Sequence, residues 1–218
     1  MKQITTEDMR RMLKLYFIMG SVNCRLSPEE TLTQAIAGGI TIFQFREKGP
    51  GALRGNAAYD LARQLQDICR EHGIPFIVND DVELAIALDA DGVHVGQEDE
   101  PAGSIRQRIG AHKIVGVSAH SLAEAQQAIA DGADYLGIGP VYPTSSKDDA
   151  RAVQGTQVIE QLRSSRLTIP LVGIGGITTV NVPAVIQAGA DGVSVISAIA
   201  AAGDIRAAAQ QLLQATLM

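Results

Sequence analysis

The chain has 218 residues, 46% of them hydrophobic, and a formal net charge of −6 at pH 7. This length and hydrophobic content suit one domain, 1–218, with a single well-filled core. An acidic chain has no overall positive field that would attract nucleic acid or an anionic membrane. We therefore expect small-molecule substrates as partners, with any anionic ligand bound by local groups. The sequence leaves open whether the chain forms a homo-oligomer.

The chain begins with a short polar, helical lead over residues 1–12, which is followed by an apolar run at residues 15–19. That run is too short for the hydrophobic part of a signal peptide or for a membrane span. The sequence therefore predicts a soluble, cytoplasmic protein. Cys24 and Cys69 lie far apart and neither belongs to a Cys-x-x-Cys pair, which argues against a zinc centre or a disulfide framework. We expect both to be ordinary core residues.

Eight short runs have the apolar and β-branched composition of buried strands. They lie at residues 15–19, 41–45, 75–78, 92–95, 113–117, 135–138, 170–174 and 192–196. Stretches with helical spacing lie between them, for example 53–70, 122–130 and 180–187. Because strands that alternate with helices form parallel βα units, the sequence predicts an α/β fold. The expected architecture is a single (β/α)₈ TIM barrel with its active site at the C-terminal ends of the strands.

An internal repeat supports this count of strands. Four segments align without gaps, at residues 35–41, 85–91, 128–134 and 185–191, and each precedes an even-numbered strand. Each ends a helix at a cap that contains Gly or Asp and leads to the next strand. That end of a barrel contributes stability rather than chemistry, so we expect the site at the opposite end.

Polar and charged side chains alternate from the end of the second predicted strand into the segment after it. Gln44, Arg46 and Lys48 alternate along an extended segment, so their side chains share one face and can bind a polyanion together. Glu47 is expected to point away from that face. A solvated, charged turn is the alternative interpretation.

Two carboxylates follow neighbouring strands, Asp80 after the third and Asp99 after the fourth. Two hard oxygen ligands, completed by phosphate oxygens and water, would suit octahedral Mg²⁺. Each aspartate precedes a helical stretch, so a helix N-cap is the alternative for both. Glu98 is a competing ligand that spacing does not exclude.

Glycine turns lie near the last two predicted strands, at residues 173–176 and 189–197. Backbone N–H groups can close on an anion there, and the last two strands are the usual phosphate position of a barrel. Relief of crowding between strands and helices is the alternative role for such glycines. Residues 139–154 form a connection too long and too polar for a tight turn, which indicates a functional loop.

The four histidines have different expected roles. His72 and His112 lie in polar surroundings near turns and are expected at the surface. His94 lies within the fourth strand, where a hydrogen-bonded interior residue is favoured over a metal ligand because no second His or Cys offers metal spacing. His120 follows the fifth strand and is placed to act as an acid or base.

Together these motifs resemble the thiamine-phosphate synthase family, from about the first strand to the eighth. The segments that carry the resemblance are 44–48, 78–80, 92–99, 116–120, 139–144, Lys147, 172–177 and 189–197. The glycine turns alone occur in many phosphate-binding barrels. The motifs Gln-x-Arg-Glu-Lys, Asn-Asp and Gly-Gln-Glu-Asp, in this order, are specific.

The resemblance implies transfer of a 4-amino-2-methylpyrimidin-5-ylmethyl group from its diphosphate to the ring nitrogen of a thiazole phosphate. The products would be thiamine monophosphate and pyrophosphate. It implies Mg²⁺ as cofactor, held by Asp80 and Asp99, and a catalytic set of Arg46, Lys48, Ser118 and Lys147. The pyrimidine diphosphate would contact Gln44, Phe45, Arg46, Glu47, Lys48, Asn79, Ser118 and Lys147. The thiazole phosphate would contact Thr144, Ser145, Ser146, Gly176, Ile196 and Ser197.

One departure from the family pattern is visible, since the family often has Thr-x-Thr before the lysine and this chain has Thr144-Ser145-Ser146. A hydroxyl is kept at Ser146, so only its fine positioning differs. Two alternatives are a thiazole tautomerase on the same barrel that uses His120, and a non-catalytic sensor of a phosphate ligand. The sequence leaves open whether the thiazole carries a carboxyl group.

Overall fold

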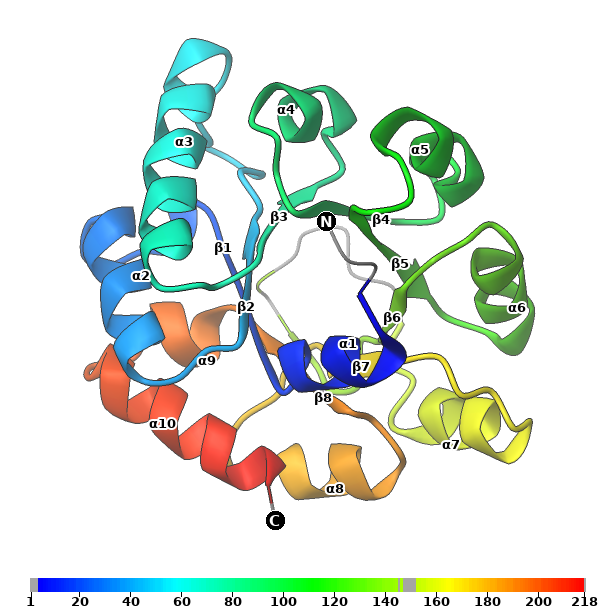
Figure 1. The fold of residues 1–218 in the computed structure, drawn as a ribbon. Helices are drawn as coiled ribbons and strands as arrows, with labels where there is room; N and C mark the ends of the chain where they lie inside the picture. The colour runs from blue at the N-terminus through cyan, green and yellow to red at the C-terminus, as the bar shows by residue number, and fades with distance from the viewer. Residues whose placement is uncertain (1–3, 145, 147–151, 218) are drawn as a thin grey trace.

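The computed structural model describes residues 4–144, 146 and 152–217. Eight parallel strands pair in sequence order and close into one barrel (Figure 1). The strands are β1 Leu15–Met19, β2 Ile42–Phe45, β3 Phe76–Asn79, β4 Gly92–Val95, β5 Ile114–Ala119, β6 Tyr135–Ile138, β7 Leu171–Ile174 and β8 Gly192–Val195. The predicted barrel is therefore confirmed. The fifth strand runs further than its sequence pattern indicates, so Ser118 lies within β5 rather than after it.

Helices alternate with the strands, as the sequence predicts (Figure 1). They are α1 Thr6–Met12, α2 Pro28–Ala37, α3 Asn56–Glu71, α4 Val82–Ala87, α5 Ala102–Ile109, α6 Leu122–Ala130, α7 Gln157–Ser164, α8 Val182–Gln187, α9 Ser197–Ala200 and α10 Ile205–Thr216, with a 3₁₀ turn, η1, at Ser21–Asn23. The helices α2 to α10 surround the barrel, whereas α1 lies across one end (Figure 1). In the described part of the chain, no helix combines the length and apolar character needed to cross a membrane.

Two helices begin later than predicted. α3 begins at Asn56 because Gly55 before it has a φ of 55°, a left-handed conformation that cannot continue a right-handed helix. α8 begins at Val182, and Val180 is 89% exposed. Pro183 fits the first turn of α8 because a first-turn N–H has no partner within the helix.

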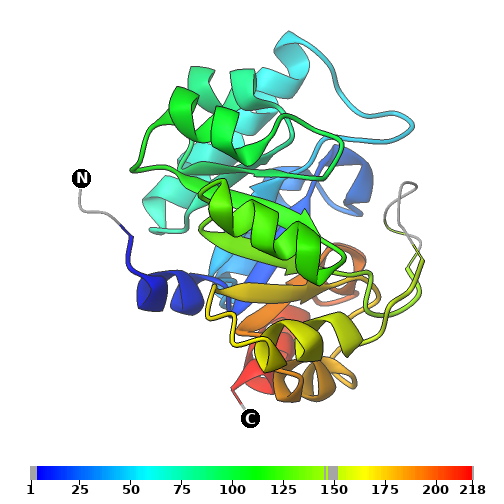
Figure 2. The same ribbon diagram turned by 90° about the vertical axis from the view of Figure 1, so that its right-hand side faces the viewer.

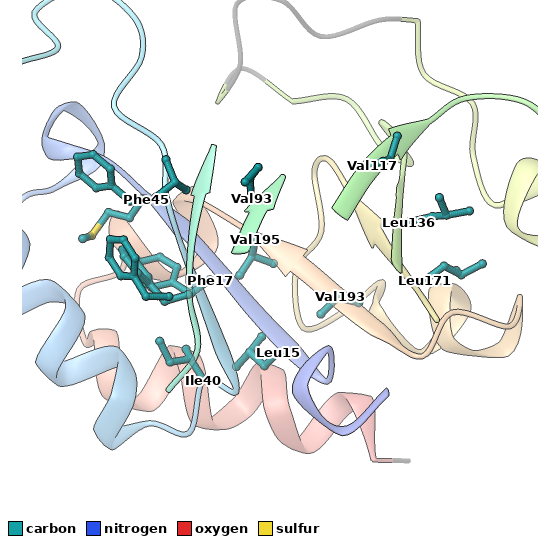
Figure 3. Packing of buried hydrophobic residues seen from close by; sticks show 14 of the residues in the cluster. Leu15, Phe17, Ile40, Phe45, Val93, Val117, Leu136, Leu171, Val193 and Val195 are labelled. Atoms are coloured by element: carbon teal, nitrogen blue, oxygen red, sulfur yellow. The ribbon is translucent and has the colours of Figure 1, made fainter. Parts of the chain in front are cut away.

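Alternate residues of each strand face two different cores. In β1, Leu15 and Phe17 pack between strands and helices, whereas Tyr16 and Ile18 point into the barrel interior. Figure 3 shows part of the outer layer, including Phe17 and Phe45. The inner layer also takes Met9 of α1. In the side view of Figure 2, α1 lies at one end of the barrel, and the segment between β2 and α3 extends from the other.

The four-fold repeat ties the strands together at the α1 end. The last residue of each segment, Thr41, Asp91, Asp134 or Asp191, accepts a hydrogen bond from the backbone N–H of Leu15, Phe76, Val115 or Leu171, at 2.8 to 2.9 Å. The backbone N–H of the same residue donates to the carbonyl of that same partner. Each repeat thus joins an even strand to the odd strand before it by a two-way bond, which explains the repeat as a structural device.

Candidate active site

A cleft of about 230 Å³ opens at the C-terminal ends of the strands. It is lined by many of the residues that the sequence singles out, namely Arg46, Lys48, Asn79, Asp80, Glu98, Asp99, Ser118, His120 and Thr144. These residues come from the ends of five successive strands, β2 to β6, and from the connections that follow them, which the closed barrel brings to one mouth. The convergence that the sequence predicts for them is confirmed.

The segment after β2 sends alternate side chains in opposite directions. Arg46 and Lys48 line the cleft, and Arg46 is only 7% exposed. Glu47 points elsewhere, as the alternation predicts, because its carboxylate accepts hydrogen bonds from the backbone N–H groups of Ser21 and Leu53, at 2.7 and 2.8 Å. Glu47 therefore holds the loops after β1 and β2 together rather than facing the cleft, so its side chain is not placed for the donor contact that the resemblance implies.

Two other residues assigned to the donor substrate lie deeper. Phe45 is 2% exposed and packs in the layer between strands and helices, so its side chain does not reach the mouth. Gln44 is 1% exposed and donates from Nε2 to the Tyr16 hydroxyl at 2.8 Å. Its Oε1 has no hydrogen-bond partner among the described residues. A buried acceptor of this kind costs free energy unless a ligand satisfies it.

Asp80 and Asp99 face each other across the edge of the cleft. Asp80 accepts from Lys48 Nζ at 2.6 Å, and Asp99 accepts from the Gly96 N–H at 2.7 Å. Burial raises the pKa of Asp99, and the neighbouring Asp80 carboxylate raises it further. The Asp80 backbone has a φ of 60°, a conformation that is uncommon for a residue with a side chain.

The helix N-cap alternative is wrong for both aspartates. Asp81 caps α4, and Pro101 precedes α5. Two hard, mutually repelling carboxylates fit a divalent cation such as Mg²⁺, which would relieve their repulsion. Among the residues that the structure describes, no three His, Cys, Asp or Glu side chains are grouped to hold a metal ion by themselves. Further ligands would have to come from substrate oxygens and water.

The histidines lie where their sequence context predicts. His72 and His112 are exposed. His94 is 8% exposed and hydrogen-bonded through both ring nitrogens, to Tyr135 and Ser118, each at 2.9 Å. His120 lines the cleft, and its Nδ1 lies 3.0 Å from Glu124 Oε2.

A second cleft, of about 290 Å³, adjoins the first and shares Thr144, Ile174 and Gly175 with it. Its other lining residues include four of the predicted candidates, Ser146, Gly176, Ile196 and Ser197. Ser146 Oγ donates to Ser197 Oγ at 3.0 Å. Ser145 and Lys147 lie outside the described residues.

Only part of the glycine-rich sequence forms this second cleft. Gly175 and Gly176 have φ values of 98° and 61°, and a Cβ on Gly176 would lie 2.4 Å from the Pro143 carbonyl oxygen. Gly189 instead packs against Arg163 at the α1 end, and Gly192 faces the Leu13 backbone. The expected anion cup is therefore wrong for 189–192, where glycine relieves crowding.

Comparison with known proteins places this barrel among its relatives. The family model described as "Thiamine monophosphate synthase" matches residues 15–199. The chain belongs to the thiamine monophosphate synthase family. It is 60% identical over 212 residues to the thiamine-phosphate synthase of Geobacillus thermodenitrificans strain NG80-2, covering 97% of this chain and 96% of that one. It is 58% identical over 215 residues to that of Geobacillus kaustophilus strain HTA426, covering 99% and 97%.

A solved structure agrees with the family assignment. Thiamine phosphate pyrophosphorylase from Pyrococcus furiosus superposes with a TM-score of 0.85 at 38% identity, covering 95% of this chain and 97% of that one. The resemblance seen in the motifs is thus confirmed over nearly the whole chain. Like these family members, the protein is a transferase of the thiamine-phosphate diphosphorylase class.

Sequence reasoning missed two tyrosines beneath the cleft of this family member. Tyr16 on β1 and Tyr135 on β6 are fully buried, and their hydroxyls lie 2.7 Å apart. The signal was weak, because a tyrosine in an apolar strand has the same pattern as a core phenylalanine. Only the barrel closure, which brings β1 and β6 to face each other, shows that their polar ends meet.

Proposed function

We propose that the protein joins a pyrimidinylmethyl diphosphate to a thiazole phosphate, forming thiamine monophosphate and releasing pyrophosphate. The observation that carries this proposal is the pair of adjoining clefts. One contains two cations and two facing carboxylates, as a metal-bound diphosphate requires. The other contains left-handed glycines and hydroxyls, as a monophosphate requires.

In this proposal the donor substrate occupies the first cleft. Arg46 and Lys48 would bind the diphosphate, with hydrogen bonds from Asn79 and Ser118, and Lys147 would join them as the family motif implies. The buried Gln44 Oε1 would accept a hydrogen bond from the amino group of the pyrimidine. This assignment gives the unpartnered acceptor of Gln44 a partner.

Asp80 and Asp99 would hold Mg²⁺ between the protein and the diphosphate. When bound, the ion supplies positive charge to the oxygens of the leaving group. Lys48 lies 2.6 Å from Asp80, so this lysine can contact both the carboxylate and a diphosphate oxygen. The cleft residues would thereby hold the leaving group in a fixed, positively charged environment.

The main role of the protein in this reaction would be to stabilise the charge that develops on the leaving group. The bond between the methylene carbon and the diphosphate oxygen breaks first, and both electrons leave with pyrophosphate. The electron-rich aminopyrimidine stabilises the cation left behind, and the thiazole nitrogen then donates its lone pair to the methylene carbon. No proton is removed in either step, so no general base is required. Arg46, Lys48 and Ser118 would act on the developing negative charge, which is commonly the largest catalytic contribution.

The acceptor would occupy the second cleft with its phosphate toward Gly176 and Ser197. Thr144, Ser145, Ser146 and Ile196 would complete this site. Because Thr144 and Gly175 line both clefts, an acceptor held there lies next to the donor. The two adjoining clefts would thus hold the two substrates side by side.

The test is to mix the protein with both substrates and MgCl₂ and to measure pyrophosphate and thiamine phosphate. Stoichiometric formation of both products is expected. A thiazole tautomerase is a second candidate, because His120 lines the cleft with Glu124 behind it. It would isomerise the thiazole without the pyrimidine diphosphate. Binding of both phosphates without any turnover would instead indicate a sensor, and either result would overturn the synthase proposal.

A further inference from the structure

A chain of hydrogen bonds runs through the barrel interior and ends at the first cleft. Gln44 Nε2 donates to Tyr16 Oη at 2.8 Å, and the Tyr16 and Tyr135 hydroxyls are 2.7 Å apart. His94 Nδ1 lies 2.9 Å from Tyr135 Oη, and His94 Nε2 lies 2.9 Å from Ser118 Oγ. These residues come from five strands, and of them His94 and Ser118 line the cleft.

Glycines in the neighbouring strands leave room for these hydrogen-bonded side chains. A Cβ on Gly116 of β5 would lie 2.1 Å from Tyr135 Cζ, so only glycine lets the phenol cross that strand. A Cβ on Gly137 of β6 would lie 3.2 Å from His94 Cε1 and 4.0 Å from Ser118 Oγ. The two glycines thus define the positions of both rings.

The donors and acceptors determine which group donates and which accepts in each of these hydrogen bonds. Burial raises the pKa of both phenols well above the ordinary value, so each keeps its proton. Tyr16 Oη accepts from Gln44, and its own proton has one acceptor within the described residues, Tyr135 Oη. With Gln44 Nε2 directed at Tyr16, the opposite direction would leave the buried Tyr16 hydroxyl proton without an acceptor, which costs free energy.

The same reasoning fixes the imidazole. Tyr135 Oη accepts from Tyr16, so it donates its own proton to His94 Nδ1. An Nδ1 that accepts a hydrogen bond belongs to the neutral tautomer with its proton on Nε2. That Nε2–H donates to Ser118 Oγ. The Ser118 hydroxyl proton then remains available for an acceptor in the cleft.

We propose that Tyr135, supported by Tyr16, holds His94 in the Nε2–H tautomer and so makes the Ser118 hydroxyl a hydrogen-bond donor to the diphosphate. Tyr135 is then a positioning residue, since it is fully buried, lines neither cleft and acts through His94. The kinetic consequence rests on the proposed function. The tautomer of His94 depends only on the protein and can be measured without any substrate.

The first test is ¹⁵N NMR of the histidine side chains in the protein without substrates. His94 is assigned by the loss of its signals in His94→Gln. The ¹⁵N shifts of the two ring nitrogens distinguish the two neutral tautomers and the imidazolium. We expect the Nε2–H tautomer in the native protein and a mixture in Tyr135→Phe. The Nδ1–H form or the imidazolium in the native protein overturns the proposal, and so does an unchanged tautomer in Tyr135→Phe.

The second test is a double-mutant cycle between Tyr135→Phe and Ser118→Ala. Ser118→Ala removes a hydrogen bond to a charged group and should lower kcat roughly 10- to 100-fold. Tyr135→Phe alone should lower kcat roughly 10-fold, with less change in the KM of the donor. In the Ser118→Ala background, Tyr135→Phe should change kcat by less than about 2-fold, because the Ser118 hydroxyl through which Tyr135 acts is absent. Additive losses would show a merely structural role and overturn the proposal.

Tyr59→Phe is the matched control, since Tyr59 lies on the surface of α3 and is 37% exposed. It should leave both kcat and the His94 signals unchanged. Circular dichroism and melting curves check that each variant folds. If Tyr135→Phe does not fold, the His94 tautomer of the native protein still tests the proposal by itself. If the native protein shows no synthase turnover, the kinetic cycle fails with the proposed function, while the NMR result stands separately.

Discussion

The two ends of the barrel both carry aspartates, but they use them in opposite ways. At the α1 end, Asp191 accepts from the Leu171 N–H and from Arg163, at 2.9 and 2.8 Å, and Arg10 lies 3.2 Å away. At the mouth, Asp99 accepts one backbone N–H and faces the Asp80 carboxylate, and the nearby Lys48, which pairs with Asp80, offsets only part of the effect that raises the pKa of Asp99. The same side chain is surrounded by fixed donors at one end and set against a like charge at the other.

This difference indicates where the fold is stabilised and where it is prepared for a ligand. A carboxylate with several donors built into the chain stabilises the fold without any ligand. Two adjacent carboxylates destabilise each other until a cation binds. The electrostatic strain at the mouth is therefore expected to be relieved by metal and substrate, and mutations at the two ends should separate activity from stability.

The largest expected effect is on activity at the mouth. Asp99→Asn keeps an oxygen for the Gly96 N–H but removes a charge that would hold Mg²⁺. We expect kcat to fall on the order of 100- to 1000-fold, with no loss in melting temperature. Pyrophosphate release at saturating substrates and MgCl₂ measures it. Asp81→Asn, which keeps the N-cap of α4, is the neighbouring control and should retain activity. An active Asp99→Asn enzyme would contradict the assigned role.

The opposite result is expected at the α1 end. Asp191→Ala leaves the Leu171 N–H without its side-chain acceptor and removes the carboxylate that faces Arg163 and Arg10. We expect a loss of roughly 3 kcal/mol in the free energy of unfolding, which corresponds to a fall of about 6 to 12 °C in melting temperature. At a temperature where the variant is folded, kcat should equal that of the native protein. The exposed Asp60 supplies the control Asp60→Ala, and a kcat loss specific to Asp191→Ala would break the comparison between the two ends.

The sequence predicts the barrel well because its signals are local. Apolar runs at regular spacing mark the strands, and the repeat that ends at Thr41, Asp91, Asp134 and Asp191 marks the structural end of the barrel. Residues directly after strands, such as Arg46 and Asp80, follow from barrel topology. Their convergence needs no detail of packing.

What the sequence could not predict depends on contacts between distant strands. Tyr16 and Tyr135 meet across the barrel, 119 positions apart in the chain. Gly175 and Gly189 both belong to predicted glycine turns, but one lines a cleft and the other packs on Arg163. For Gly189 the sequence carries two conflicting signals, because the repeat at 185–191 places it at the structural end of the barrel and the glycine turn at 189–197 suggests an anion site. The structure agrees with the repeat.

A smaller effect separates the two clefts at the mouth. Gly176→Ala places a Cβ 2.4 Å from the Pro143 carbonyl oxygen and 2.8 Å from Tyr142 Cβ, on a backbone with a φ of 61°. We expect the KM for the thiazole phosphate to rise on the order of 10-fold, through a distorted acceptor site. The KM for the pyrimidine diphosphate should stay unchanged. Steady-state kinetics with each substrate varied in turn measures both, and equal rises in the two KM values would contradict separate sites.

The smallest effect is a pH dependence of stability that originates at the mouth. Burial and the Asp80 carboxylate raise the pKa of Asp99, so the folded protein keeps a proton there at pH values where the unfolded chain has lost it. Stability without metal therefore falls as the pH rises from about 3.9, the pKa of an unfolded aspartate, through the raised pKa of the folded state. Asp99→Asn lacks this decline.

In EDTA, the melting temperature of Asp99→Asn relative to the native protein should therefore increase slightly from about pH 3 to pH 7. Carboxylates distant from Asp80 and Asp99 are present in both proteins and cancel in the difference. Added MgCl₂ should stabilise the native protein at neutral pH and reverse the sign, because a ligand that binds only the folded state raises its stability. A difference that stays constant with pH would show that the facing carboxylates do not repel each other, and the contrast with the α1 end would then rest on activity alone.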